Sequence, residues 1–199
     1  VVHIINDGKG GDVIPDSVEQ AIVSRIDRLG RQYLMALKCA SVAGNDFVDE
    51  MLMHMLPEVG ISKAEVPAII GELVSMGLLV PCENSKFYTH SFKSALVREV
   101  VYYRLPFNQR RGLHTAVAQW IEEQYKDSLS SFYPVLAQHW QFAELDGEAV
   151  RYFELCADVA LKQYANHEAV SFLNDVLTIV HKCTPEERVE LGVTVEKHA

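Results

Sequence analysis

No apolar stretch in this 199-residue sequence is long enough to cross a bilayer, because a transmembrane helix needs about 20 consecutive apolar residues. Residues 1–12, VVHIINDGKGGD, become polar too soon for a signal peptide. These two absences predict a cytoplasmic protein that does not insert into a membrane. The sequence also lacks an initiator methionine, which predicts that it was cut from a longer chain.

Cysteine is scarce, and no two of the four cysteines have the spacing of a zinc-binding pair: Cys39, Cys82, Cys156 and Cys183. Cys39 and Cys156 fall on apolar helical faces, where a free thiol packs as a small hydrophobic group. We therefore predict free thiols, a reducing compartment and no metal site.

Basic residues are outnumbered, with 18 Lys and Arg against 27 Asp and Glu and a formal net charge of -9. Binding to nucleic-acid phosphates depends on a basic surface that releases counterions, so this balance predicts no nucleic-acid partner. The apolar fraction of 49% and the charged fraction of 23% are those of an ordinary folded protein.

Catalytic constellations are also missing. The GKGGD string resembles a phosphate loop, but Lys9 is followed by glycines and Asp12 instead of the Ser or Thr that would bind the metal. No strand ends in acidic residues, and no Ser-His-Asp or Cys-His arrangement is evident. We predict a chain without catalytic residues and without a cofactor of its own.

What the sequence does contain is helical periodicity up to residue 76. Apolar residues recur at helical spacing over residues 16–29, 31–42, 45–56 and 62–76, and Ser62 with Glu65 forms a capping box. Residues 78–81 and 87–90 are then strand-like around a polar loop, which predicts a β-hairpin. Short helices followed by a hairpin are typical of a winged-helix domain, predicted here over residues 16–106. Residues 1–15 are predicted to be a strand and turn left from a preceding ATPase domain.

A winged helix prompts the hypothesis of DNA binding, which requires basic residues on the helix before the wing and on the wing itself. That helix has Lys63 against Glu65 and Glu72, and the wing has Lys86 against Glu83. The charge pattern argues against DNA recognition.

The stretch from Phe87 to Leu105 joins the hairpin to an amphipathic helix, for which Leu96 and Val100 are the expected packing anchors. His90 is either a ligand-sensing group or a half-exposed strand histidine, and the second interpretation is favoured. For Arg98, a structural ion pair is favoured over a nucleotide contact. Gln109, Arg110 and Arg111 form a small basic cluster. It either binds an acidic helix or a phosphate or is a solvated face, and the second interpretation is favoured.

Residues 107–199 show only helical signals, and we predict a truncated tetratricopeptide-like array there. Helices are expected over residues 134–145, 147–164 and 167–181, after a polar linker at 126–131. The string Glu148-Ala149-Val150 recurs twenty residues later as Glu168-Ala169-Val170. Stacked helical repeats give such matches, although the usual tetratricopeptide period is about 34 residues.

Four strings together resemble a known family: IPDSVEQAIVSRIDRLGRQYLMALKCASVAGNDF, GELVSMGLL, FYTHSFKSALVREVVYYRL with QRRGLHTAVAQWIEE, and LAQHWQFAELDGEAVRYFELCADVALKQYANHEAVSFLNDVL. They resemble the region after the nucleotide-binding domain of AAA-like (STAND-type) signal-transduction ATPases. The likeness is closest to the segment after the cyclase domains of soluble-type class III adenylate cyclases.

The resemblance implies a noncatalytic regulatory and coupling module of an adenylate (or guanylate) cyclase, with ATP and magnesium bound elsewhere in the parent protein. It implies as partners the preceding nucleotide-binding domain and proteins that bind the helical repeats. The alternatives are a tetratricopeptide-type interaction adaptor and an ATPase-linked transcription regulator. Ser94 stands where the family has a histidine, so Ser94, His90 and Arg98 are the weak candidates for a nucleotide contact.

Overall fold

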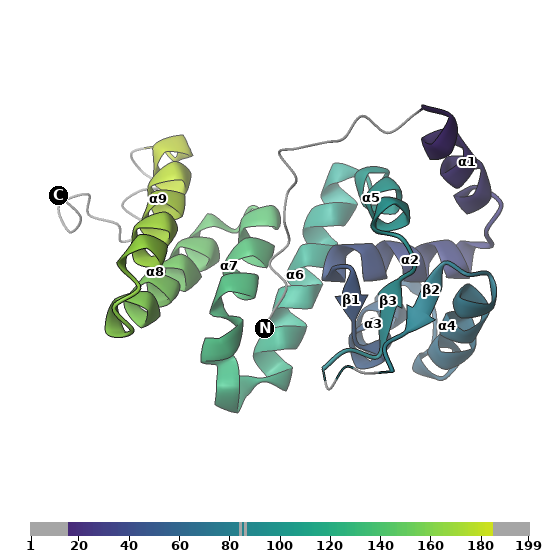
Figure 1. The fold of residues 1–199 in the computed structure, drawn as a ribbon, viewed down its shortest axis with the longest axis horizontal. Coiled ribbons are helices and arrows are strands. Elements are labelled where there is room, and N and C mark those ends of the chain that lie inside the picture. The colour runs from purple at the N-terminus through teal and green to yellow at the C-terminus, as the bar shows by residue number, and fades with distance from the viewer. Residues whose placement is uncertain (1–15, 84, 86, 185–199) are drawn as a thin grey trace. The chain divides into compact units, whose positions relative to one another are not determined.

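The structure is a computed structural model that describes residues 16–83, 85 and 87–184. It is mainly helical with one small antiparallel sheet (Figure 1), which confirms the predicted mainly α class. The predicted strand and turn at residues 1–15 lie outside the described residues, as do residues 185–199 of the predicted helical array. The chain divides into two compact units between Trp120 and Ile121.

Within its described residues, the first unit contains five helices, two 3₁₀ turns, three strands and most of a sixth helix. In chain order these are α1 (Asp16–Ile26), α2 (Arg31–Ala43), β1 (Asp46–Phe47), α3 (Asp49–Met55), η1 (Leu56–Val59), η2 (Lys63–Glu65), α4 (Val66–Ser75), β2 (Leu79–Pro81), β3 (His90–Phe92), α5 (Ala95–Tyr103) and α6 (Phe107–Gln124).

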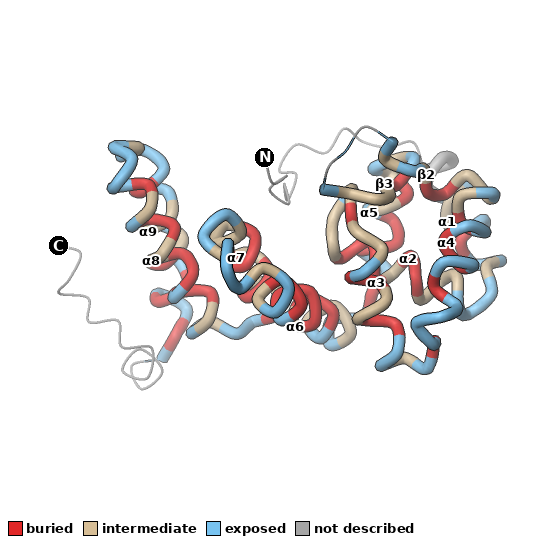
Figure 2. Tube along the Cα trace, turned by 90° about the horizontal axis from the view of Figure 1, so that it is seen from below, coloured by how far each residue is buried: buried red, intermediate tan, exposed pale blue. Residues whose placement is uncertain are grey.

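Helix α2 lies at the centre of this unit and contacts β1, α3, α4 and α5. Its second half is enclosed, as the red tube in Figure 2 shows: Ala36, Leu37, Cys39, Ala40 and Val42 are buried. The small residues Ala36, Cys39 and Ala40 let neighbouring helices approach closely.

The sheet has the order β1-β3-β2, with β3 antiparallel to both neighbours (Figure 1). The predicted hairpin is present, but its second strand is His90–Phe92 instead of 87–90. Leu79 pairs with Phe92 and Pro81 with His90, so the connecting loop is longer than predicted. Strand β3 extends to Phe92 because the Phe92 side chain is buried and the Phe92 main-chain N–H donates to the Asn45 carbonyl at 2.9 Å.

Strand β1 is absent from the sequence-based prediction, which treated Asn45 or Asp46 as the start of a helix. Two residues are too short to show a period, yet Phe47 is buried and pairs with His90. Helix α3 therefore begins at Asp49. The predicted capping box at η2 is confirmed, since the Ser62 N–H donates to the Glu65 carboxylate at 2.8 Å and this contact lowers the pKa of Glu65.

The second unit contains the last turn of α6, η3 (Lys126–Phe132), α7 (Tyr133–Phe142), α8 (Asp146–Lys162) and α9 (Asn166–Lys182). Helix α8 packs against both α7 and α9. The predicted linker at 126–131 forms the 3₁₀ segment η3 instead. The rings of Tyr125 and Phe132 stack with centroids 4.1 Å apart across its ends, which gives this polar stretch an apolar contact that its own composition does not reveal.

The turns after α7 and α8 have the same geometry. Glu144 and Tyr164 both have positive φ angles, and the next N–H groups donate back to the Trp140 and Ala160 carbonyls, as in a Schellman turn. These turns are twenty residues apart, so the sequence match at that offset compares the starts of two consecutive helices. The match therefore spans one helix with its turn, which is shorter than a helix pair.

Candidate functional site

His90 lies on β3 and is held by a carboxylate. Its Nδ1 donates to Asp49 Oδ1 at 2.7 Å, and the side chains are 18% and 23% exposed. The Thr89 hydroxyl donates to the same oxygen at 2.5 Å and accepts from the Asp49 N–H at 2.9 Å. In a catalytic triad the hydroxyl nucleophile is hydrogen-bonded to the histidine, whereas the Thr89 hydroxyl is bonded to Asp49. The arrangement therefore joins β3 to the start of α3 and does not activate the threonine.

We expect Asp49→Ala to lower the free energy of unfolding by about 1 to 3 kcal/mol, because it leaves two partly buried polar groups without their acceptor. Urea unfolding followed by fluorescence measures this loss. Asp49→Asn is the matched control, since its amide oxygen still accepts one hydrogen bond. A loss below about 0.5 kcal/mol in the alanine variant would show that these hydrogen bonds do not hold β3 to α3.

Ser94 and Arg98 occupy the start of α5. Ser94 is the N-cap by its main chain only, with its carbonyl accepting from the N–H groups of Val97 and Arg98. The Arg98 Nε donates to the Ser41 carbonyl in the last turn of α2 at 3.0 Å. A cation at a helix C-terminus satisfies an otherwise unpaired carbonyl and interacts well with the helix dipole, so Arg98 ties α5 to α2.

Tyr102 forms the centre of a polar cluster between α5 and α6, which we name the α5–α6 joint: Arg98, Tyr102, Arg110 and His114. The Tyr102 hydroxyl lies 3.0 Å from Nε2 of His114, which is completely buried. The guanidinium carbons of Arg110 and Arg98 lie 4.7 Å and 5.7 Å from the Tyr102 ring centre. Cation–π contacts of this kind stabilise a packed ring. His114 is too enclosed to touch a substrate, so the joint holds two helices together.

The Gln109–Arg111 cluster does not form one basic surface. Gln109 accepts a hydrogen bond from the Lys38 Nζ at 3.3 Å, Arg110 stacks on Tyr102, and the Arg111 guanidinium lies 5.8 Å from the Phe107 ring centre. Each side chain serves a different neighbour, because successive residues on a helix point about 100° apart.

Helix α8 is tied to the last turn of α6 by a second polar group. The Tyr152 hydroxyl donates to Glu122 Oε1 at 2.5 Å, and the Arg151 guanidinium lies 4.5 Å from the Tyr152 ring centre. Burial and the Glu122 carboxylate raise the pKa of Tyr152. Arg151 also pairs with Glu148 at 2.8 Å. These contacts lie within the second unit and anchor α8 to α6.

The two most buried thiols, Cys39 and Cys156, are poor nucleophiles. All four cysteines are free, which confirms that prediction. Burial raises the pKa of both Cys39 and Cys156 to about 12, so these thiols stay protonated at neutral pH and the thiolate is the reactive form. Within residues 16–83, 85 and 87–184, no group of three His, Cys, Asp or Glu side chains is placed to hold a metal ion. In the same part of the chain, none of the helices combines the length and the apolar character of a membrane span.

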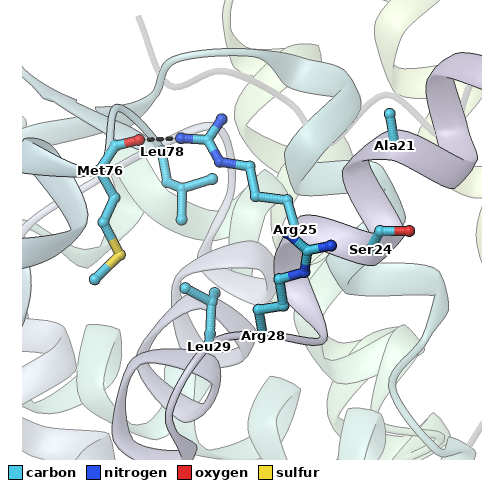
Figure 3. A pocket seen from close by; sticks show the side chains of 7 residues that line it. All are labelled: Ala21, Ser24, Arg25, Arg28, Leu29, Met76 and Leu78. Atoms are coloured by element: carbon cyan, nitrogen blue, oxygen red, sulfur yellow. Dashed lines mark hydrogen bonds between the residues drawn. The ribbon is translucent and has the colours of Figure 1, made fainter.

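The first unit also has an open hollow of about 470 Å³ between α1 and the turn from α4 to β2, which we name the α1 hollow (Figure 3). Its apolar walls are Ala21, Leu29, Met76 and Leu78, and its polar side chains are Ser24, Arg25 and Arg28.

Arg25 projects from the last turn of α1 and Arg28 from the turn that follows this helix. The Arg25 guanidinium donates to the Met76 carbonyl at the end of α4. Arg25 therefore caps α4, while Arg28 makes no hydrogen bond or ion pair with the described residues.

No protein-family model, curated protein or solved structure matches the chain. Function must therefore be argued from the contacts described above and from the family resemblance of the sequence.

The sequence predicted a structural ion pair for Arg98 and a half-exposed strand position for His90, but it did not indicate which residues these side chains contact. Tyr102 and His114 lie on different helices, and Asp49 and His90 are 41 positions apart. No periodicity links such pairs. The one available signal for His114 is its place on the apolar side of α6, between Leu113 and Val117.

Proposed function

We propose that the chain is a noncatalytic regulatory and coupling module of a multidomain signalling ATPase that controls a class III adenylate (or guanylate) cyclase. The observation that carries the proposal is helix α6, which belongs to both compact units. His114 on this helix bonds to Tyr102 in the first unit, and Glu122 on its last turn bonds to Tyr152 in the second. In this proposal, α6 transmits a change at one of these contacts to the other.

The order of elements supports a winged-helix domain in the first unit. Strand β1 lies between α2 and α3 in the chain, and α4 follows before the β2–β3 hairpin. The sheet order is β1-β3-β2. The loop between β2 and β3 is the proposed wing. The contacts of α8 with α7 and with α9, and the matching turns after α7 and α8, support a helical-repeat array in the second unit.

The proposed mechanism assigns binding and hydrolysis of ATP with magnesium to a preceding domain of the same protein. The winged helix rests on that domain in one nucleotide state, and α6 passes the change to the repeats. The repeats then bind partners or hold the resting state of the cyclase. Ser94 stands where the resembled family has a histidine. It is half-buried and caps α5 through its main-chain carbonyl, which supports a start of α5 that does not contact the nucleotide directly.

Calorimetry with ATP and magnesium tests this division of labour. We expect the 199-residue chain alone to show no saturable binding at micromolar ATP, because the candidate residues His90 and Arg98 are already bonded to Asp49 and to the Ser41 carbonyl. A micromolar Kd for the chain alone would contradict the proposal. In the full-length protein, the rate of cyclic-nucleotide synthesis should respond to the nucleotide bound in the ATPase domain only while this module is intact. A full-length protein without cyclase activity would contradict the assignment to a cyclase.

The apolar side chains exposed near the α8–α9 turn favour a second candidate, an interaction adaptor. Leu161, Tyr164 and Val170 are 50%, 90% and 57% exposed, whereas Val150, the counterpart of Val170 in the preceding helix, is buried. Exposed apolar clusters mark protein-interaction sites. If the repeats bind a partner peptide in the absence of any ATPase domain, and Tyr164→Ala abolishes that binding, the adaptor function would be supported instead.

A further inference from the structure

The α1 hollow combines apolar walls with a local excess of positive charge. None of its lining residues is acidic, and two of the seven are arginines. A third cation lies beside it: a methyl group placed on Gly77 would be 3.5 Å from the Lys93 Nζ and 4.0 Å from the Arg25 guanidinium. Two cations therefore line the hollow and a third lies near Arg25, outside the lining, in a chain whose formal net charge is -9.

The carboxylate nearest to these cations in the sequence does not neutralise them. Asp27 lies between Arg25 and Arg28 but points to Arg104, with 2.8 Å between the Arg104 Nη2 and the Asp27 carboxylate. Arg25 spends one donor on the Met76 carbonyl. Since a guanidinium has five N–H donors, Arg25 retains donors for a ligand, and Arg28 has no hydrogen-bond partner among the described residues.

We propose that the α1 hollow binds a short acidic segment of a partner protein, with one apolar side chain of that segment in the hollow and a flanking carboxylate on Arg28 and Arg25. Arginine binds carboxylates with two parallel hydrogen bonds, and the walls formed by Leu29, Met76 and Leu78 suit an aliphatic anchor. The hollow is open to solvent, whereas small-molecule sites bury most of their ligand, so a side chain on a protein segment is the better fit. This inference does not depend on the proposed cyclase function.

A fluorescein-labelled peptide with a central leucine flanked by glutamates tests the proposal, with fluorescence anisotropy on the 199-residue chain as the measurement. We expect saturable binding that weakens at least tenfold in Arg28→Glu and is lost in Ala21→Trp, which fills the hollow from an exposed helical position. Arg31→Glu is the matched control, since Arg31 is an exposed arginine outside the lining, and it should change binding less than threefold. Thermal melting checks that each variant is folded.

Several outcomes would overturn the proposal. Absence of saturable binding, or equal weakening by Arg28→Glu and Arg31→Glu, would show that the hollow is not the site. Equal binding of a peptide with glutamines in place of glutamates would remove the role of the arginines. Binding of octanoate at the hollow without binding of the peptide would identify a small-molecule site instead.

Discussion

Gln119→Pro should separate the unfolding of the two units. Gln119 is exposed on α6 between the His114 and Glu122 contacts, and a proline inside a helix removes a hydrogen bond and clashes with the preceding turn at a cost of about 3 kcal/mol or more. Hydrogen exchange followed by mass spectrometry measures the effect. In the wild-type chain we expect peptides from α2 and from α8 to open with a common free energy, and in the variant we expect two different values.

Gln119→Ala is the matched control, because alanine favours the helix and should leave the common opening unchanged. The proposal that α6 couples the units is contradicted if α2 and α8 already open independently in the wild-type chain. It is equally contradicted if the proline variant still opens as one unit.

Tyr102→Ala is expected to destabilise the first unit by about 3 to 5 kcal/mol, the range for removing a buried aromatic side chain. The variant loses the packed ring, the contact with His114 and the surface on which Arg98 and Arg110 stack. Urea unfolding measures the change. Tyr102→Phe is the control, since it keeps the ring and removes only the hydroxyl, for which we expect a loss of about 1 kcal/mol.

A small effect of Tyr102→Ala would mean that the α5–α6 joint is held by other contacts. In that case Val101, which is almost fully buried on the same helix, would be the next residue to truncate. Leu96 is a poorer choice than its hydrophobicity suggests. It is only half-buried, so truncating it should cost less than the 2 to 5 kcal/mol typical of a fully buried leucine.

The difference between Leu96 and its neighbours shows where sequence-based prediction of a helix face reaches its limit. The helix after β3 was expected, and Val100 is buried as predicted. The buried face, however, is made by Val97, Val100, Val101 and Tyr102, whereas Tyr103 is 63% exposed. Val97, Val100 and Val101 follow helical spacing, but Leu96 and Tyr103 are apolar residues beside this stripe. The packing of neighbouring elements decides which of these apolar residues become buried.

The start of α3 shows a similar limit at a helix terminus. Asn45 and Asp46 are residues that commonly cap helices, and nothing nearby in sequence indicates a strand. Phe47 nevertheless pairs with His90, which lies more than forty residues later. Strand β1 exists because β3 is available to pair with it, and that partner is not local information.

The sequence by itself determined the helical class, the hairpin, the free thiols and the extents of α7, α8 and α9, because periodicity, capping residues and glycine or proline breaks act within a few residues of the chain. Only the tertiary structure decided that Asp49 holds His90, that Tyr102 and His114 join α5 to α6, and that Arg25 and Arg28 border a hollow. Each of these contacts joins residues from different elements, and their distances depend on how whole helices pack.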